Sequence, residues 1–237
     1  ECLTPVRLCR IHRPDFEAII DTAKEAFIRW METGEPDKHL QGIDLPDVPL
    51  WAAWAIQRYS HDTDVPTARE RYGELVAQLI DFIIDGKHPN LQVVDNGLVR
   101  TDGTRQPMSW MDSARPDGTP LIPRTGYLVE FNALWYNALM FLLQMYADDK
   151  QMQSRVERWQ KISDAYAESF APTFLNDYGY LYDYVNGSYT DLSVRPNMVI
   201  AVGVDHTPLD RRQRKRILDF VTRELLTPKG LRTLSPN

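Results

Sequence analysis

Cysteine is scarce in this chain of 237 residues, which contains only Cys2 and Cys9. Two cysteines cannot form the disulfide framework of a small secreted domain, so we expect both to be free thiols. No stretch has the roughly 18 uncharged apolar residues that a membrane-spanning helix needs. A signal peptide is also missing, but the chain starts at Glu1 and not at methionine, so this absence says little. We expect a cytoplasmic protein that does not enter a membrane.

Positive charge is not in excess either. The net charge of −6 and the isoelectric point near 5.4 argue against nucleic acid as the main partner. The histidines do not have the spacing of metal ligands, and neither a Gly-rich phosphate loop nor a Gly-x-Ser-x-Gly turn occurs. We therefore expect no metal and no cofactor. The five scattered histidines are His12, His39, His61, His88 and His206.

Helical periodicity is the main pattern that is present. Apolar residues make up 43% of the chain, and its length is sufficient for one soluble domain with a sizeable core. We find no repeat of the solenoid kind. The sequence therefore predicts an all-α fold, a bundle or toroid in a single domain over residues 1–237. The segments with helical spacing are 15–32, 47–59, 66–86, 129–146, 152–171, 195–204 and 208–225.

Several residues predict where these helices begin and end. Asp15 and Asp47 are placed to cap two N-termini, and Pro172 is placed to end the helix that precedes it. In the last helix we expect Ile217, Leu218, Phe220, Val221 and Leu225 to face inward and the basic residues 211–216 to face solvent.

Two Asn-Gly pairs predict β-hairpins. Asn96-Gly97 is flanked by apolar pairs within residues 92–100, and Asn186-Gly187 follows a tyrosine-rich stretch within residues 174–190. The tyrosines have two interpretations, which are packing across strands and stacking on sugar rings. The segment after Leu225 predicts a loop.

The most informative stretch runs from Pro107 to Leu139. Prolines and glycines break any regular pattern between residues 102 and 126, so this part predicts a loop. The residues after it are apolar around the whole helical cylinder, which is typical of a helix enclosed by other elements. Glu130, Asn132 and Asn137 interrupt this apolar run, and a buried carboxylate is costly unless it is paired. The pattern predicts a polar pocket at the start of this helix.

These same residues resemble a known family. Ser109-Trp-Met-Asp112, Pro123-Arg-Thr-Gly126 and Val129-Glu-Phe-Asn-Ala-Leu-Trp-Tyr136 are similar to segments of the glucosidase domain of glycogen debranching enzymes, in the same order and spacing. Further similarity appears in Leu181-Tyr-Asp183, Arg195-Pro-Asn197 and Leu226 to Leu234. The resemblance implies an amylo-α-1,6-glucosidase on an (α/α)6 toroid, the six-hairpin glycosidase fold. It also implies glycogen or a related α-glucan oligosaccharide as the partner.

The chain departs from the family pattern in several places. Met198 replaces the usual Gln, and Val48-Pro49 stands where the family often has Ala-Ser. The family's Trp-Gly-Arg-Asp segment and its second catalytic carboxylate have no counterpart here. We therefore expect the central part of such a domain, an incomplete toroid. Its exposed apolar flanks would be covered by self-association, and by itself it would lack a catalytic base.

By resemblance, Asp112 is the general acid of an inverting hydrolysis, which needs an acid and a base about 6.5–9.5 Å apart. We expect Trp110 and Met111 to desolvate Asp112, which would raise its pKa and let it hold a proton. Without the family, a loop-capping Asp is an equally open interpretation. The resemblance also makes Asp47 and its neighbour Trp51 substrate-facing.

The remaining candidate substrate contacts each have a structural alternative. Glu130 and Arg124 either bind sugar hydroxyls or form a buried ion pair. Trp135 either lines the pocket with Asn132 and Tyr136, on one side of the helix, or packs in the core. Arg195 and Asn197 either bind substrate or bond loop carbonyls.

Three functions remain open from the sequence. The first is hydrolysis of α-1,6-linked glucose at branch points, with Asp112 as the acid. The second is a non-catalytic α-glucan-binding helical module. The third is a helical scaffold without a sugar site. The buried charges disfavour it, because burying a charge costs stability and a scaffold would have no binding or catalytic use for these residues.

Overall fold

The computed structural model describes residues 12–40 and 42–236, and its described part is mostly helical. Cys2 and Cys9, expected to be free thiols, lie outside the described residues. The expectation of an all-α fold is confirmed. The α-helices are α2 (Arg13–Thr33), α3 (Asp47–Asp62), α4 (Val65–Ala68), α5 (Glu74–Ile84), α6 (Val129–Tyr146), α7 (Gln153–Phe174), α8 (Asn197–Gly203) and α9 (Arg211–Leu225). A π-helical turn (Arg69–Gly73) joins α4 to α5, and a 3-10 turn (Lys150–Met152) precedes α7.

The strands are short and form small antiparallel sheets. β1 pairs with β2, β4 pairs with both β3 and β5, and β6 pairs with β7. Both predicted hairpins are confirmed, whereas the expected loop after α9 contains the small β6–β7 hairpin. The strands are β1 (Gln92–Val93), β2 (Val99–Arg100), β3 (Tyr127–Leu128), β4 (Tyr184–Asn186), β5 (Tyr189–Thr190), β6 (Leu226–Thr227) and β7 (Gly230–Leu231).

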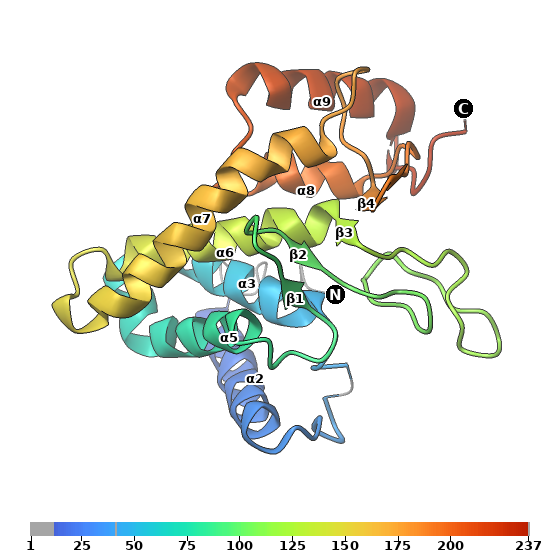
Figure 1. Ribbon diagram of the computed structural model, residues 1–237. Coiled ribbons are helices and arrows are strands. Elements are labelled where there is room, and N and C mark those ends of the chain that lie inside the picture. The colour runs from blue at the N-terminus through green and yellow to red at the C-terminus, as the bar shows by residue number, and fades with distance from the viewer. Residues whose placement is uncertain (1–11, 41, 237) are drawn as a thin grey trace.

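Helix α6 is the central element of the molecule. It packs against α3, α7 and α8 and also contacts α5, with α2 beyond α5 on one side and α9 beyond α8 on the other (Figure 1). Its apolar side chains are buried around the whole cylinder, as the sequence predicts. Since the long loop between β2 and β3 extends to one side of the N-terminal end of α6 (Figure 1), this end meets the loop that carries Asp112.

The polar side chains inside α6 hold distant segments against it. Nδ2 of Asn132 donates to the carbonyl of Val99, and its Oδ1 accepts from the Val99 N–H. Nε1 of Trp135 donates to the carbonyl of Gly97, which has φ 79° and lies so close to α7 that a Cβ there would be 2.5 Å from the carbonyl of Ile162. These contacts fasten the β1–β2 hairpin to α6.

Two helix starts differ from the prediction. Helix α2 begins at Arg13 with His12 as its N-cap, and Asp15 lies in the first turn, because Pro14 favours the helical φ at the start. Helix α3 begins at Asp47 itself, and its N-cap Pro46 makes no side-chain cap bond. The expectation of capping is therefore wrong for both aspartates.

Helix α7 continues through Pro172 to Phe174, whereas the sequence predicts an end at the proline. A proline so close to the C-terminus removes one hydrogen bond, and the Leu175 N–H then donates to the carbonyl of Ala171. The extra turn buries Phe174 against Phe170, with ring centroids 4.9 Å apart.

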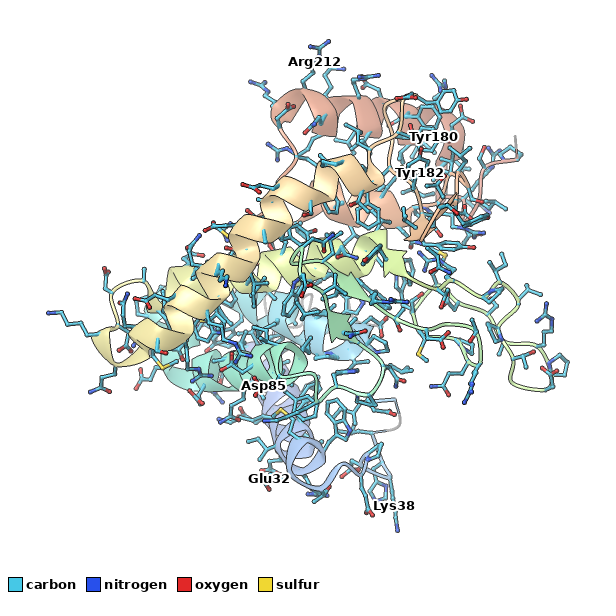
Figure 2. All side chains as sticks on the ribbon, in the orientation of Figure 1. Glu32, Lys38, Asp85, Tyr180, Tyr182 and Arg212 are labelled. Carbon is cyan, nitrogen blue, oxygen red and sulfur yellow. The ribbon has the colours of Figure 1, made fainter. Side chains whose placement is uncertain are left out.

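Helix α9 begins at Arg211, because Asp210 and Gln213 form a reciprocal capping box there. Leu218 is 42% exposed, so its predicted inward orientation is wrong. The basic residues of this helix mostly face solvent, and Arg212 points away from the molecule (Figure 2).

Candidate functional site

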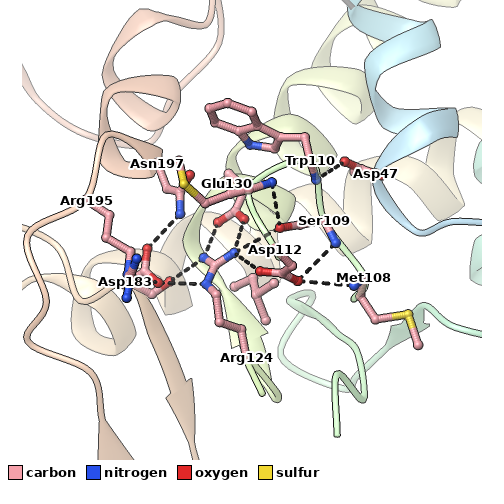
Figure 3. A network of polar contacts seen from close by, with 12 residues as sticks. Asp47, Met108, Ser109, Trp110, Asp112, Arg124, Glu130, Asp183, Arg195 and Asn197 are labelled. Atoms are coloured by element: carbon pink, nitrogen blue, oxygen red, sulfur yellow. Dashed lines mark hydrogen bonds and ion pairs between the residues drawn. The ribbon is translucent and has the colours of Figure 1, made fainter. Parts of the chain in front are cut away.

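Asp112 lies in a tight turn whose backbone holds its carboxylate. The Asp112 N–H donates to the carbonyl of Ser109, which closes the turn. Its Oδ2 accepts from the N–H groups of Met108 and Ser109, each at 3.1 Å (Figure 3). The side chain is 2% exposed, and Oδ1 lies 3.5 Å from Nη1 of Arg124. Local turn chemistry and one buried cation therefore fix the orientation of this carboxylate.

The side chains beside Asp112 are arranged differently from the prediction. Met111 is half-buried and lines a pocket with Asp112. Trp110 is 54% exposed, so its indole is not the buried wall that the sequence predicts. Its backbone N–H donates to Oδ2 of Asp47 at 2.9 Å.

Asp47 is almost fully buried at the first residue of α3. Burial raises the pKa of Asp47 to about 6, and the negative charge of Asp112 adds to this rise. The hydrogen bond from the Trp110 amide opposes it by stabilising the anion. The Asp47 carboxyl group therefore changes its charge near pH 6.

The raised pKa of Asp47 predicts a stability gain for Asp47→Asn. The folded chain holds this proton more tightly than the unfolded chain, so the charge costs stability as pH rises from about 4 to about 6. At pH 7 the variant should be more stable by up to about 3 kcal/mol, and below pH 4 the gain should vanish. Urea unfolding of both proteins at pH 7 and below pH 4 measures this difference in stability.

Asp117→Asn is the matched control, because Asp117 is exposed and bonds to Thr119 lower its pKa. This variant should show no gain at pH 7. Equal effects of the two substitutions at every pH would contradict the assignment of a buried, proton-holding carboxyl to Asp47.

Arg124 is the centre of a buried ion cluster. Its Nη1 and Nη2 donate to the two carboxylate oxygens of Glu130 at 2.6 and 2.9 Å, and its Nε donates to Oδ2 of Asp183 at 2.7 Å. Nη1 also donates to Oγ of Ser109 at 3.1 Å (Figure 3). One guanidinium therefore joins the Asp112 loop to α6 and to the segment before β4.

Burial and charge act in opposite directions within this cluster. Burial alone would lower the pKa of Arg124, but the carboxylates of Glu130 and Asp183 raise it well above its ordinary value. Burial raises the pKa of Glu130 and that of Asp183, and the charge of Arg124 opposes the rise. Arg124 therefore stays charged, and the two carboxylates depend on it.

Asp183 extends the cluster toward α8. Its Oδ1 accepts from Nδ2 of Asn197 at 2.8 Å, and its Oδ2 lies 3.4 Å from Nε of Arg195. Sequence reasoning noted the Leu-Tyr-Asp segment but did not identify Asp183 as a site residue. The signal that was available is an acidic residue that follows apolar and aromatic neighbours in a segment shared with the family.

A small pocket of about 180 Å³ opens beside Asp112. Its volume is below the range of about 300–1,000 Å³ that is typical of ligand pockets. Asp112 is the one carboxylate among its described lining residues, and Arg124 and Arg195 supply positive charge. Ser113, Leu121, Ile122 and Thr233 are lining residues that the sequence did not single out. The full lining is Met111, Asp112, Ser113, Leu121, Ile122, Arg124, Arg195 and Thr233.

Several predicted contacts lie elsewhere. Asn132 and Trp135 bond the β1–β2 hairpin, and Tyr136 stacks on Tyr166 with centroids 4.7 Å apart. For Trp135 the geometry favours packing in the core, one of the two interpretations that the sequence leaves open. Trp51 is half-buried against Trp54.

For Glu130 and Arg124, the geometry favours the buried ion pair over sugar binding. Glu130 is fully buried, and both its carboxylate oxygens accept from Arg124. Asn197 is likewise buried on Asp183. Arg195 remains as a predicted contact that reaches the pocket.

Within residues 12–40 and 42–236, no group of three or more His, Cys, Asp or Glu side chains is arranged to hold a metal ion. In the same part of the chain, no helix is long and apolar enough to cross a membrane.

Fold and site together define a helical domain in which a buried ion cluster supports a small pocket that contains Asp112. Sequence comparison matches residues 39–237 to the family described as amylo-alpha-1,6-glucosidase. Because the match covers most of the chain, the chain belongs to this family, and the resemblance of its motifs is confirmed. The family comprises glycogen-debranching glycosidase domains. Comparison with curated proteins gave no match.

Proposed function

We propose that this chain acts on α-1,6-linked glucose at the branch points of glycogen or a related α-glucan, with Asp112 as general acid of an inverting hydrolysis. One observation carries the proposal. Asp112 lies within the family motif and is the carboxylate that reaches the pocket among its described lining residues. A general acid must protonate the oxygen that leaves as the glycosidic bond breaks.

The geometry of Asp112 supports this role by fixing the orientation of the carboxyl group. Oδ2 accepts two N–H groups, from Met108 and Ser109. Oδ1 has no such backbone donor and faces Nη1 of Arg124 at 3.5 Å, which is too long for a strong hydrogen bond. The backbone therefore keeps the carboxyl in a fixed orientation, as acid catalysis requires.

Substrate contacts follow from the side chains at the pocket. Arg195 lines the pocket, and its Nε faces Oδ2 of Asp183 at 3.4 Å. We assign the other nitrogens of its guanidinium to sugar hydroxyls. The exposed indole of Trp110 offers an aromatic face for stacking on a sugar ring.

Trp110→Ala should weaken binding of a phosphorylase-limit dextrin about tenfold, which corresponds to about 1.4 kcal/mol. The reason is the loss of the aromatic face beside the pocket. Isothermal titration calorimetry measures the change. Tyr178→Ala is the matched control, because Tyr178 is 70% exposed and does not line the pocket. Equal affinity of both variants and the unaltered chain would contradict the assignment.

The proposal extends to the architecture. Neighbouring helices such as α6 and α7, joined by a short turn, resemble the helix pairs of an (α/α)6 toroid, and we propose that the described helices belong to one. Self-association through exposed apolar residues remains a prediction, which analytical ultracentrifugation checks.

The alternative function is a non-catalytic α-glucan-binding module. One observation favours it, because inverting hydrolysis uses two carboxyl groups and the described lining of the pocket contains only Asp112. This alternative predicts that dextrin binding survives Asp112→Asn and that neither form releases glucose.

A further inference from the structure

Two carboxylates share one short run of backbone amides. The N–H groups of Met108 and Ser109 donate to Oδ2 of Asp112, and the next N–H, that of Trp110, donates to Oδ2 of Asp47 (Figure 3). All three bonds measure 2.9–3.1 Å. Successive amides aimed at anions form a small electropositive concavity. The orientation of this turn therefore depends on both carboxylates.

Asp47 joins this turn to the helical body. It is the first residue of α3 and lies 63 positions before Trp110 in the chain. Among the hydrogen bonds of the described residues, this is the one that ties residues 108–112 to α3. The opposite side of the turn is held by Arg124, which donates to Ser109 Oγ. Loss of the Asp47 contact would leave the turn anchored on one side.

Few groups lie close enough to Asp47 to act on the charge of its carboxylate. Asp112 is the charged residue that faces it, and its negative charge disfavours the Asp47 anion. The Trp110 amide, the backbone of Asp47 and the Trp51 indole favour that anion. Both carboxyls are nearly excluded from water, so their mutual repulsion is only weakly screened.

We propose that Asp47 is a positioning residue that holds the Asp112 turn through the Trp110 amide. In this role Asp47 does not contact the sugar. Its catalytic consequence rests on the proposed function of Asp112, whereas its contact with the Trp110 amide does not. Burial, which raises the pKa of Asp47 to about 6, puts its change of charge close to neutral pH.

The first test follows the backbone amide of Trp110 by ¹H–¹⁵N NMR of the full chain labelled at tryptophan, over a range of pH, and compares it with Asp47→Asn. Loss of one backbone amide signal in Trp110→Phe assigns Trp110. In the unaltered chain this signal should shift with a midpoint near pH 6, where Asp47 changes its charge, and the shift should disappear in Asp47→Asn. A Trp110 amide with the same pH dependence in both proteins overturns the proposal, whether or not the chain has any enzymatic activity.

The second test separates positioning from substrate contact by kinetics on limit dextrin. Asp47→Ala removes the acceptor for the Trp110 amide, whereas Asp47→Asn keeps an acceptor oxygen. Positioning predicts that Asp47→Ala lowers kcat at least tenfold with KM unchanged, and that Asp47→Asn retains most of the activity. A rise in KM of similar size in both variants would show direct sugar contact and overturn the proposal. Circular dichroism of each variant confirms that the fold is kept.

Discussion

Replacing Arg124 by methionine should lower the free energy of unfolding by about 3–5 kcal/mol, which is the cost of leaving a buried charge without its partner. Glu130 and Asp183 are both fully buried and both accept hydrogen bonds from this guanidinium. Methionine restores the volume but neither the charge nor the donors. Urea unfolding at pH 7 measures the loss.

The same variant should recover part of its stability at low pH. Burial raises the pKa of Glu130 and of Asp183, so without the guanidinium these carboxyls take up protons in the folded state more readily than in the unfolded state. Their cost therefore grows as pH rises and shrinks as pH falls. A loss that is the same at pH 5 and pH 7 would contradict this explanation.

Arg158→Met is the matched control for Arg124→Met. Arg158 forms an ion pair of similar length with Asp85, 2.7 Å, but the two side chains are 45% and 32% exposed to solvent. Exposed pairs contribute about 0–1 kcal/mol, so this substitution should change stability by less than about 1 kcal/mol. If the two arginine variants lost similar amounts, Arg124 would not be the centre of the cluster.

Asp112→Asn should reduce glucose release from an α-1,6-branched dextrin by about 10²–10⁴-fold, which is the usual contribution of a general acid. Asparagine keeps an acceptor for the Met108 and Ser109 amides, so the turn should remain folded. Hydrolysis of α-glucosyl fluoride should change far less, because fluoride leaves without a proton. Initial rates on both substrates measure the difference.

Asp117→Asn is the control for Asp112→Asn, since Asp117 lies in the same long loop but is exposed and bonds only within its own turn. It should leave both rates unchanged. Equal slowing of the two substrates by Asp112→Asn would indicate lost structure and would contradict the acid role.

Helix α6 shows what local sequence determines. Its predicted span, 129–146, agrees with the structure, because its apolar residues surround the whole cylinder and the breakers before it are strong. The roles of its polar residues were not predictable in the same way. Asn132 and Trp135 bond a hairpin more than 30 residues earlier, and no property of α6 alone indicates which segment packs there.

In the candidate site, too, residues in contiguous motifs were predictable from the sequence, and residues that depend on long-range contacts were not. Asp112 was predictable, because its turn and its motif are contiguous in sequence. Asp183 was not, since it reaches Arg124 across 59 residues. Asp47 seemed suited to cap α3, but its side chain accepts from the Trp110 amide, and that contact depends on the tertiary packing of the loop. The ion pair of Arg124 with Glu130, six residues away, was among the predicted alternatives, whereas the contacts that Asp47 and Asp183 make with distant segments were not.

The most direct test of the account is the reaction of limit dextrin with the chain in the presence of azide. Azide supplies the attacking group, so the outcome depends on the acid and not on a catalytic base. The account predicts that the unaltered chain forms β-glucosyl azide and that Asp112→Asn forms none. Equal formation by both proteins, or dextrin binding without any product from the unaltered chain, would contradict the assignment of Asp112 as the acid of an α-1,6-glucosidase.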